Sequence, residues 1–384
     1  MATHSVLLLS GTATITTLSL IAVYRSQDDA SVSISRTSWQ GITIWAVRSI
    51  TLHTLALLSL SYSASTKQSI LAKKDPSAHD LRKMDKLSST SIFNTMRVIG
   101  TIASLHLLAI PLLYPNDGPL QQVSLRVACF FFACKLLDLT LARAHKPPTR
   151  LKNGKAIHIQ TAAERLSYCW LLLSQCRYHS FDIAVVEKNR TGPAKKSIQY
   201  GIPLVIVVMT FLFPIAEVLI LFALVAIQFG LEGCHLILDP HFTHPLFWQP
   251  FAAPSISEFW STHWHQGARP LLYSLGYMPA NAICGRLFGK KAGRIAGVLA
   301  TFSLSGIWHG WCAAALSKNP WRTALGLWAM FVAHGVLCIL ERVIWGKQQG
   351  SIVQRVTIWG IALLLAGAWL RDSLVRSRLE WPVS

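Results

Sequence analysis

Long apolar stretches, separated by shorter polar ones, dominate the chain. A membrane-spanning helix needs about 20 mostly apolar residues, and several stretches come near that length. They are residues 5–24, 41–61, 97–113, 125–142, 298–316, 321–340 and 351–370. This pattern predicts an all-α, polytopic integral membrane protein.

Two further segments are less regular. Residues 201–238 are mostly apolar but contain Pro214, Glu217 and Glu232, and their length favours a hairpin that crosses twice. Residues 166–176 are too short to span and fit a re-entrant or interfacial segment. Counting both crossings, we predict about 8–9 transmembrane helices. No internal repeat or low-complexity linker divides the chain, so we expect a single membrane domain over residues 1–384.

The charges are distributed as in a multi-span membrane protein. Basic loops lie at 62–96, 143–200 and 239–297 and are expected on the cytosolic side, because Lys and Arg favour that side. The loops at 25–40 and 114–124 carry no net positive charge and are expected on the opposite side. The tail after residue 370 has three arginines on the wrong side in this scheme, which a further re-entrant segment would explain.

Composition agrees with this layout. The chain is 52% hydrophobic and 14% charged, against about 25% charged for an ordinary soluble domain. The net charge of +19 would suggest nucleic acid in a soluble protein, but no recognition motif accompanies it. The expected partners are therefore the lipid bilayer and anionic substrates, and not nucleic acid.

Cysteine usage and the N-terminus narrow the class further. The eight cysteines are scattered and form no CxxC pair, which predicts neither a metal site nor a disulfide framework. The apolar run from Val6 has no Lys or Arg before it, so we interpret it as a retained span and not a cleaved signal.

One charged pair falls inside a predicted span. Lys135 and Asp138 are spaced i, i+3 and therefore share a helix face. They could satisfy each other in the interior of a helix bundle. Alternatively, they could line a functional path, because charges within spans are often functional.

The first segment with candidate chemistry follows a proline-rich stretch at 240–254. Ser255 and Glu258 form an S-x-x-E capping box, which predicts a helix from about residue 256. Trp260 and Trp264 would share one face of that helix, either as interfacial anchors or as substrate contacts. His265 is either a hydrogen-bonded interfacial histidine or part of an active site.

The second segment carries His309, within 298–316, a stretch without charge. An ionisable group in a membrane span is costly and usually functional. Gly306 and Gly310 would let another backbone or a substrate approach closely. Burial favours the neutral imidazole, which a general base needs near neutral pH. A core histidine bonded to a neighbouring helix is the structural alternative.

These parts suit acyl transfer from a thioester to an alcohol. His309 would take the proton of the alcohol, and His265 would orient the thioester or donate to the developing oxyanion. No Gly-x-Ser-x-Gly elbow is present, which disfavours a covalent serine route. Further candidate substrate contacts are Trp260, Trp264, Gln266, Ser305 and Trp308. Candidate partners for the phosphates of coenzyme A are Arg286, Lys290, Lys291 and Arg294, although the positive-inside rule explains these four cations equally well.

Both segments resemble the signatures of a known family, the wax synthase-like branch of the membrane-bound O-acyltransferases. The first resemblance lies in Pro245-Leu246-Phe247, Pro250, Ser255, Glu258-Phe259-Trp260 and Trp264-His265-Gln266, and the second in Ser305-Gly306-Ile307-Trp308-His309-Gly310. It implies that His309 is the active-site histidine and that His265 is the first polar position. His263 departs from the family pattern, which usually has Arg there.

The resemblance also bears on substrate and location. It is greatest to fungal members that acetylate terpenoid or meroterpenoid alcohols, implying acetyl-CoA as co-substrate, no permanent cofactor, and the endoplasmic reticulum. The competing substrate prediction is wax ester synthesis from a fatty acyl-CoA and a fatty alcohol.

Two other classes stay open. A histidine-ligated di-iron oxidase would draw on His241, His244, His263, His265 and His309, but it wants more histidine boxes than this chain has. A transporter would predict two similar halves, which the sequence does not show. Stoichiometric iron in the purified protein, or the absence of product from an acyl-CoA, would favour one of these alternatives.

Overall fold

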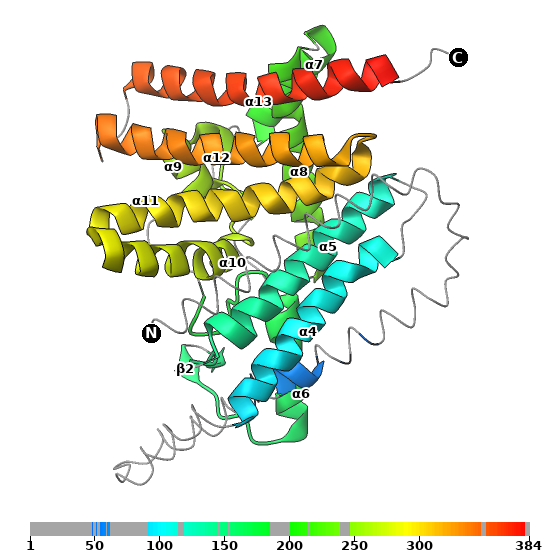
Figure 1. The fold of residues 1–384 in the computed structure, drawn as a ribbon, viewed down its shortest axis with the longest axis vertical. Helices are drawn as coiled ribbons and strands as arrows, with labels where there is room; N and C mark the ends of the chain where they lie inside the picture. Colours follow the sequence, from blue (N-terminus) through cyan, green and yellow to red (C-terminus); the bar gives the residue numbers. More distant parts are fainter. Residues whose placement is uncertain are drawn as a thin grey trace.

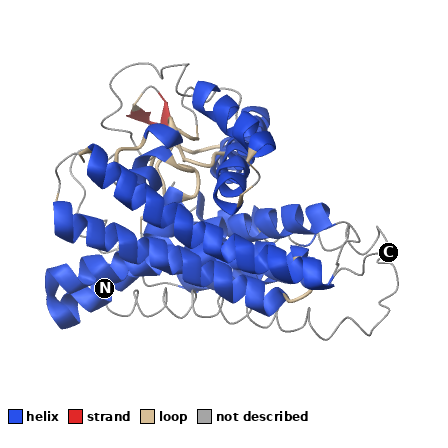
Figure 2. Cartoon of the chain, turned by 90° about the horizontal axis from the view of Figure 1, so that it is seen from above, coloured by secondary structure: helices blue, strands red, loops and turns tan. Residues whose placement is uncertain are grey.

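In the computed structural model, the described residues are helical or irregular apart from one small β-hairpin (Figure 2). Strands β1 (Leu151–Lys152) and β2 (Lys155–Ala156) pair antiparallel, with Leu151 opposite Ala156. The structure describes residues 48, 51, 54–58, 60–61, 91–113, 119–144, 146–152, 154–184, 200–213, 215–238, 246–346 and 351–380. The predicted span at 5–24 and most of that at 41–61 lie outside these residues.

Long helices form most of the described chain, with short π-helical and 3₁₀ segments between some of them. The main helices are α4 (Ser91–Leu113), α5 (Pro119–Leu137), α6 (Ala162–Ser174), α7 (Ile202–Leu212), α8 (Ala216–Leu238), α11 (Met278–Ala313), α12 (Pro320–Trp345) and α13 (Ile352–Glu380). The shorter elements are π-helices η2 (Asp138–Ala142), η5 (Phe259–His263) and η6 (Tyr273–Tyr277), 3₁₀-helices η4 (Pro250–Ala252) and η7 (Ala314–Leu316), and α-helices α9 (Ile256–Glu258) and α10 (Arg269–Leu272).

Four helices in the described part of the chain are long and apolar enough to cross a membrane. Their apolar windows are Met96–Leu113, Ala216–Gly233, Pro320–Trp345 and Ile352–Asp372. The predicted spans at 97–113, 321–340 and 351–370 coincide with three of them. The total of 8–9 spans is not confirmed.

The segment 201–238 contains two helices, as a hairpin would, but they are unequal. Helix α7 has 11 residues, and α8 has 23. Eleven residues reach only about 17 Å at 1.5 Å per residue, roughly half of the ~30 Å hydrocarbon core. Helix α7 as described is therefore short for a full crossing, and two crossings by this segment stay a prediction.

The segment predicted to connect two spans, residues 239–297, is largely helical from residue 269. Gly289 interrupts α11 with φ 87° and ψ 168°, and the two arms of the helix fold back on each other. A Cβ built on Gly293 would lie 2.8 Å from the Cα of Gly285, and one on Gly297 would lie 2.7 Å from the ring of Tyr277. This contact shows an antiparallel helical hairpin, with η6 and the first arm of α11 packed along the second arm (Figure 1).

Helices α11, α12 and α13 lie side by side, and the pair α4–α5 crosses them obliquely (Figure 1). One buried cluster joins α4 and α5 to α10 and the second arm of α11, around Phe130, Leu271 and Trp308. Another joins residues 246–264 to α12 and α13, around Phe259 and Phe331. The second arm of α11 thus has α5 packed on one side and α12 on another.

Candidate active site

His309 lies on the second arm of α11, one helical turn after Ser305. Its Nδ1 is 2.8 Å from the carbonyl oxygen of Ser305. A carbonyl only accepts, so Nδ1 carries the proton, and Nε2 holds the lone pair of the neutral imidazole. No described residue hydrogen-bonds to that Nε2. The backbone of the helix therefore fixes the tautomer of His309 in which Nε2 can accept a proton.

The surroundings of His309 combine access with enclosure. The ring of Phe331 from α12 lies 4.4 Å away, centroid to centroid. The side chain of His309 is solvent-accessible, although protein surrounds it on most sides. A small reactant could therefore reach the imidazole.

The two glycines around His309 are where α12 approaches. A Cβ on Gly306 would lie 2.9 Å from the Cα of Trp328, and one on Gly310 would lie 2.6 Å from the carbonyl oxygen of Ala324. The prediction that these glycines allow the close approach of another backbone is confirmed. Their effect is to bring Phe331 of α12 against the imidazole.

The first signature segment begins with the helix that the capping box predicts. Helix α9 starts at Ile256, and the hydroxyl of Ser255 accepts from the backbone N–H of Glu258 at 3.0 Å. A carboxylate from α12 accepts the other free N–H groups. Glu341, which is 3% exposed, accepts from the N–H of Ile256 at 3.3 Å and from the N–H of Ser257 at 2.9 Å. Its negative charge at a helix N-terminus is favourable.

The helix is shorter than predicted, which changes the setting of His265. A π-turn, η5, ends at His263, and Trp264 is extended, with φ −99° and ψ 135°. Trp260 and Trp264 still touch, edge to face, with ring centroids 6.4 Å apart. However, Trp264 is buried in the cluster around Phe259, so interfacial anchoring does not describe it.

His265 adopts a left-handed backbone conformation, with φ 35°. Such a conformation is uncommon for a residue with a side chain and often marks a functional position. The N–H of Ala268 donates to Nδ1 of His265 at 3.2 Å. Nδ1 is therefore the acceptor, and in the neutral ring Nε2 carries the proton. His265 is thus set as a hydrogen-bond donor, opposite in polarity to His309.

The segment 246–249 holds this region in place. The N–H of Gln266 donates to the carbonyl of Leu246 at 3.0 Å, and the N–H of Trp248 donates to the carbonyl of His263 at 2.9 Å. His263, where the family usually has Arg, donates from Nδ1 to the carbonyl of Trp248. This histidine therefore ties two backbone segments together and needs no ion pair.

Aromatic rings connect the two histidines. His309 contacts Phe331, which lies 5.7 Å from Trp260. Trp260 in turn contacts Trp264, the neighbour of His265. The structure thus brings the two signature segments to one aromatic cluster.

Of the other candidate substrate contacts, two are buried side chains and one acts through its backbone carbonyl. Gln266 and Trp308 are buried: the amide of Gln266 donates to the carbonyl of Trp264 at 3.0 Å, and Trp308 stacks on Phe130 at 5.4 Å. These side chains support the fold of the two segments. Ser305 contributes through its carbonyl, which orients His309.

The four cations suggested for coenzyme A do not join His309. Arg286, Lys290, Lys291 and Arg294 are exposed around Gly289, at the turn of the α11 hairpin. Lys290 precedes His309 in the same helical arm by about 28 Å, at 1.5 Å per residue. The structure gives them no contact with either histidine segment.

Sequence reasoning missed two side chains from α12. Glu341 caps α9, and His334 lies with its ring 5.9 Å from Trp260. The imidazole of His334 is buried and bonds through Nδ1 to the carbonyl of Met330 at 2.9 Å. The sequence does place a histidine and a glutamate within the apolar stretch 321–345. Ionisable groups are costly there, so both could have been identified as candidates.

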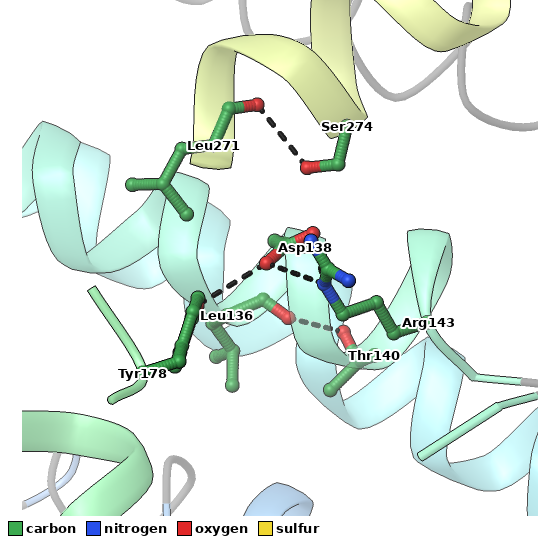
Figure 3. Close-up of polar contacts among 7 residues, drawn as sticks. All are labelled: Leu136, Asp138, Thr140, Arg143, Tyr178, Leu271 and Ser274. Atoms are coloured by element: carbon green, nitrogen blue, oxygen red, sulfur yellow. Dashed lines mark hydrogen bonds and ion pairs between the residues drawn. The ribbon is translucent and has the colours of Figure 1, made fainter. Parts of the chain in front are cut away.

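A buried polar network lies beside this site, in η2 (Figure 3). Asp138 accepts from Nε of Arg143 at 2.9 Å and from the hydroxyl of Tyr178 at 3.2 Å. Lys135 donates instead to the carbonyls of Leu173 and Gln175. The expected Lys135–Asp138 pair is thus wrong: both side chains are buried, but Lys135 bonds to backbone carbonyls and Asp138 to Arg143 and Tyr178.

This network carries distinct electrostatics. Burial, and then the carboxylate of Asp138, raise the pKa of Tyr178 well above its ordinary value. For Arg143, burial lowers the pKa, but Asp138 more than offsets it, so the net direction is upward.

The chain around Tyr178 also packs against the His265 segment. Gly267, two residues after His265, would place a Cβ 3.3 Å from Cys176. The network therefore braces the turn that packs against the His265 segment.

The described residues contain no candidate metal site. There, no group of three or more His, Cys, Asp or Glu side chains is arranged to hold a metal ion.

Comparison with known proteins gives partial matches that coincide with the site. Residues 243–333 match the membrane bound O-acyl transferase family, and this range holds both histidines. The chain is 30% identical over 161 residues to "Probable long-chain-alcohol O-fatty-acyltransferase 2" of Arabidopsis thaliana, covering 40% of this chain and 43% of the relative. It is 24% identical over 131 residues to the "Long-chain-alcohol O-fatty-acyltransferase" of Simmondsia chinensis, covering 33% and 37%.

These alignments span less than half the length of either relative. No solved structure matches the chain. The segment that matches the family, residues 243–333, carries His265 and His309, and its similarity is to membrane-bound O-acyltransferases.

Proposed function

We propose that this protein is a membrane-embedded O-acyltransferase that moves an acyl group from acyl-CoA to the hydroxyl of a hydrophobic alcohol. One observation carries the proposal: within the segment similar to this family, His309 presents an unprotonated, accessible Nε2. A neutral imidazole in that tautomer is the general base that an alcohol nucleophile requires.

The reaction follows from the two tautomers. Nε2 of His309 removes the hydroxyl proton while the alcohol oxygen attacks the thioester carbonyl carbon. Nε2–H of His265 donates to the carbonyl oxygen as it becomes negative. The tetrahedral intermediate then expels the thiolate of coenzyme A, which takes up the proton from His309. Ester and free coenzyme A are the products, and no permanent cofactor takes part.

The acceptor is proposed to be a long-chain alcohol. The similar proteins are named long-chain-alcohol O-fatty-acyltransferases, which favours the wax ester prediction over acetylation of a terpenoid. The aromatic and apolar surroundings of His309, with Phe331 and Trp260, fit an apolar acceptor. A single domain over residues 1–384 and a location in the endoplasmic reticulum stay predictions.

The test is transfer by the purified chain in lipid vesicles. A fatty acyl-CoA and a fatty alcohol should yield ester faster than acetyl-CoA and a terpenoid alcohol. His309→Ala should lower the rate roughly 10²–10⁴-fold, the usual contribution of a general base. His158→Ala, at an exposed histidine outside the site, is the control and should retain activity. Ester formation at the normal rate by His309→Ala would refute the proposal.

A further inference from the structure

The turn of the α11 hairpin, residues 285–294, is exposed and carries four cations. We call it the hairpin tip. Gly289 makes the turn with φ 87°, and a Cβ placed there would meet nothing within 4 Å. Behind it, Gly285 and Gly293 let the arms touch, since a Cβ on Gly293 would lie 2.7 Å from the carbonyl of Asn281. The tip therefore projects from two closely packed arms, with open space beside Gly289.

The tip combines unpaired cations with exposed apolar side chains. Among the described residues, none of its four cations has a hydrogen bond or ion pair. The sequence holds no Asp or Glu between Glu258 and Glu341 that could serve as a nearby counter-ion. Leu287 is 68% exposed, and Phe288 is 73% exposed. The four cations are Arg286, Lys290, Lys291 and Arg294.

We propose that the hairpin tip is a binding surface for anionic phospholipid headgroups. Leu287 and Phe288 enter the boundary of the acyl chains, and the flanking cations pair with lipid phosphates. An apolar wedge flanked by Lys and Arg binds an interface through both buried area and attraction to anionic lipid. Neither part of the tip is satisfied within the described protein, and such an interface satisfies both.

Acyl-CoA is the rival anion, and the geometry disfavours it. Lys290 lies about 28 Å from His309 along one helical arm, nearly the full ~30 Å thickness of a hydrocarbon core. A donor with its thioester at His309 would need to extend over that whole length to reach the tip. Coenzyme A also offers no partner for exposed Leu287 and Phe288.

The experiment is photo-crosslinking from the tip of the full-length protein. Phe288→p-benzoylphenylalanine is reconstituted in nanodiscs of equal phosphatidylcholine and phosphatidylglycerol, and adducts are identified by mass spectrometry. The matched control is Phe211→p-benzoylphenylalanine, on apolar α7, where Phe211 is 83% exposed. We expect lipid adducts at both positions, with phosphatidylglycerol enriched severalfold at position 288 over position 211.

A charge variant separates the tip from the net charge of the protein. K290Q/K291Q/R294Q should bring the lipid ratio at position 288 down to that at position 211. Neutralising three exposed lysines elsewhere should leave the ratio unchanged; these are Lys146, Lys152 and Lys155.

Three outcomes would overturn the proposal. They are no lipid adduct at position 288, the same lipid ratio at positions 288 and 211, or displacement of the adduct by added acyl-CoA. None of these readouts requires acyl transfer, so the proposal can fail while the proposed function stands.

Discussion

Replacing Glu341 by glutamine tests how the two signature segments are held together. The carboxylate of Glu341 belongs to α12, the helix that also carries Phe331, but its partners are at the start of α9. One oxygen accepts from the N–H of Ile256, and the other from the N–H and the hydroxyl of Ser257, at 2.9 and 2.5 Å. Glu341→Gln keeps the shape of the side chain and removes its charge.

The magnitude follows from these contacts. A hydrogen bond to a charged group contributes about 1.5–3 kcal/mol, and a negative charge at a helix N-terminus adds about 0.3–1 kcal/mol. The amide of glutamine keeps one acceptor and turns an NH₂ toward donors of Ser257. The Ser257 hydroxyl can turn to the carbonyl of Cys338, 3.4 Å away, so one donor recovers. We therefore expect a loss of about 2–4 kcal/mol.

The assay is thermal and denaturant-induced unfolding of purified protein in detergent, combined with steady-state acyl transfer. Glu341→Gln should lower the unfolding free energy and should also lower kcat, because α9 leads into Trp260 and His265. Glu258→Gln is the matched control, since the Glu258 carboxylate has no hydrogen bond among the described residues. The reasoning is refuted if Glu341→Gln unfolds like the unaltered protein, or if Glu258→Gln loses as much stability.

Two further substitutions test the packing around the site. Gly310→Ala should destabilise the protein by about 1–3 kcal/mol through overpacking, because its Cβ would lie 2.6 Å from the carbonyl oxygen of Ala324. The control, Gly360→Ala, lies in open space on α13 and should instead gain about 0.5–1 kcal/mol in unfolding measurements. Equal effects of the two substitutions would contradict the close approach of α12. Tyr178→Phe should cost about 1.5–3 kcal/mol by removing a hydrogen bond to a charged acceptor, whereas Tyr200→Phe, at an exposed ring, should cost little in the same unfolding assay.

The second signature segment could be predicted closely from the sequence because its information is local. An uncharged stretch, two glycines one turn apart, and a histidine between them specify a helix with a close neighbour on one side. The structure places that neighbour, α12, against Gly306 and Gly310. The bond from His309 to Ser305 also follows from helical spacing, since residues four apart lie on one face.

The first signature segment could be predicted only in part because its contacts are distant along the chain. Ser255 begins the helix as predicted, but the acceptor for the other free N–H groups is Glu341, from α12. The early end of that helix, at His263, follows from backbone bonds to residues 246–249, and no local pattern announces them. The turn at Gly289 was missed for a related reason: a lone glycine in a basic stretch predicts a loop as readily as a hairpin.

The choice of His309 as the base rests on access and not on its tautomer. His334, on α12, makes the same bond from Nδ1 to the carbonyl four residues before it, so this helical bond does not by itself distinguish a base. His334 is 5% exposed, whereas His309 is solvent-accessible. A general base must come within hydrogen-bond reach of its substrate, and His309 meets that condition while His334 packs against Trp260. The aromatic cluster thus leaves the ring of His309 accessible and packs against that of His334, which is why the proposed mechanism assigns the base to His309.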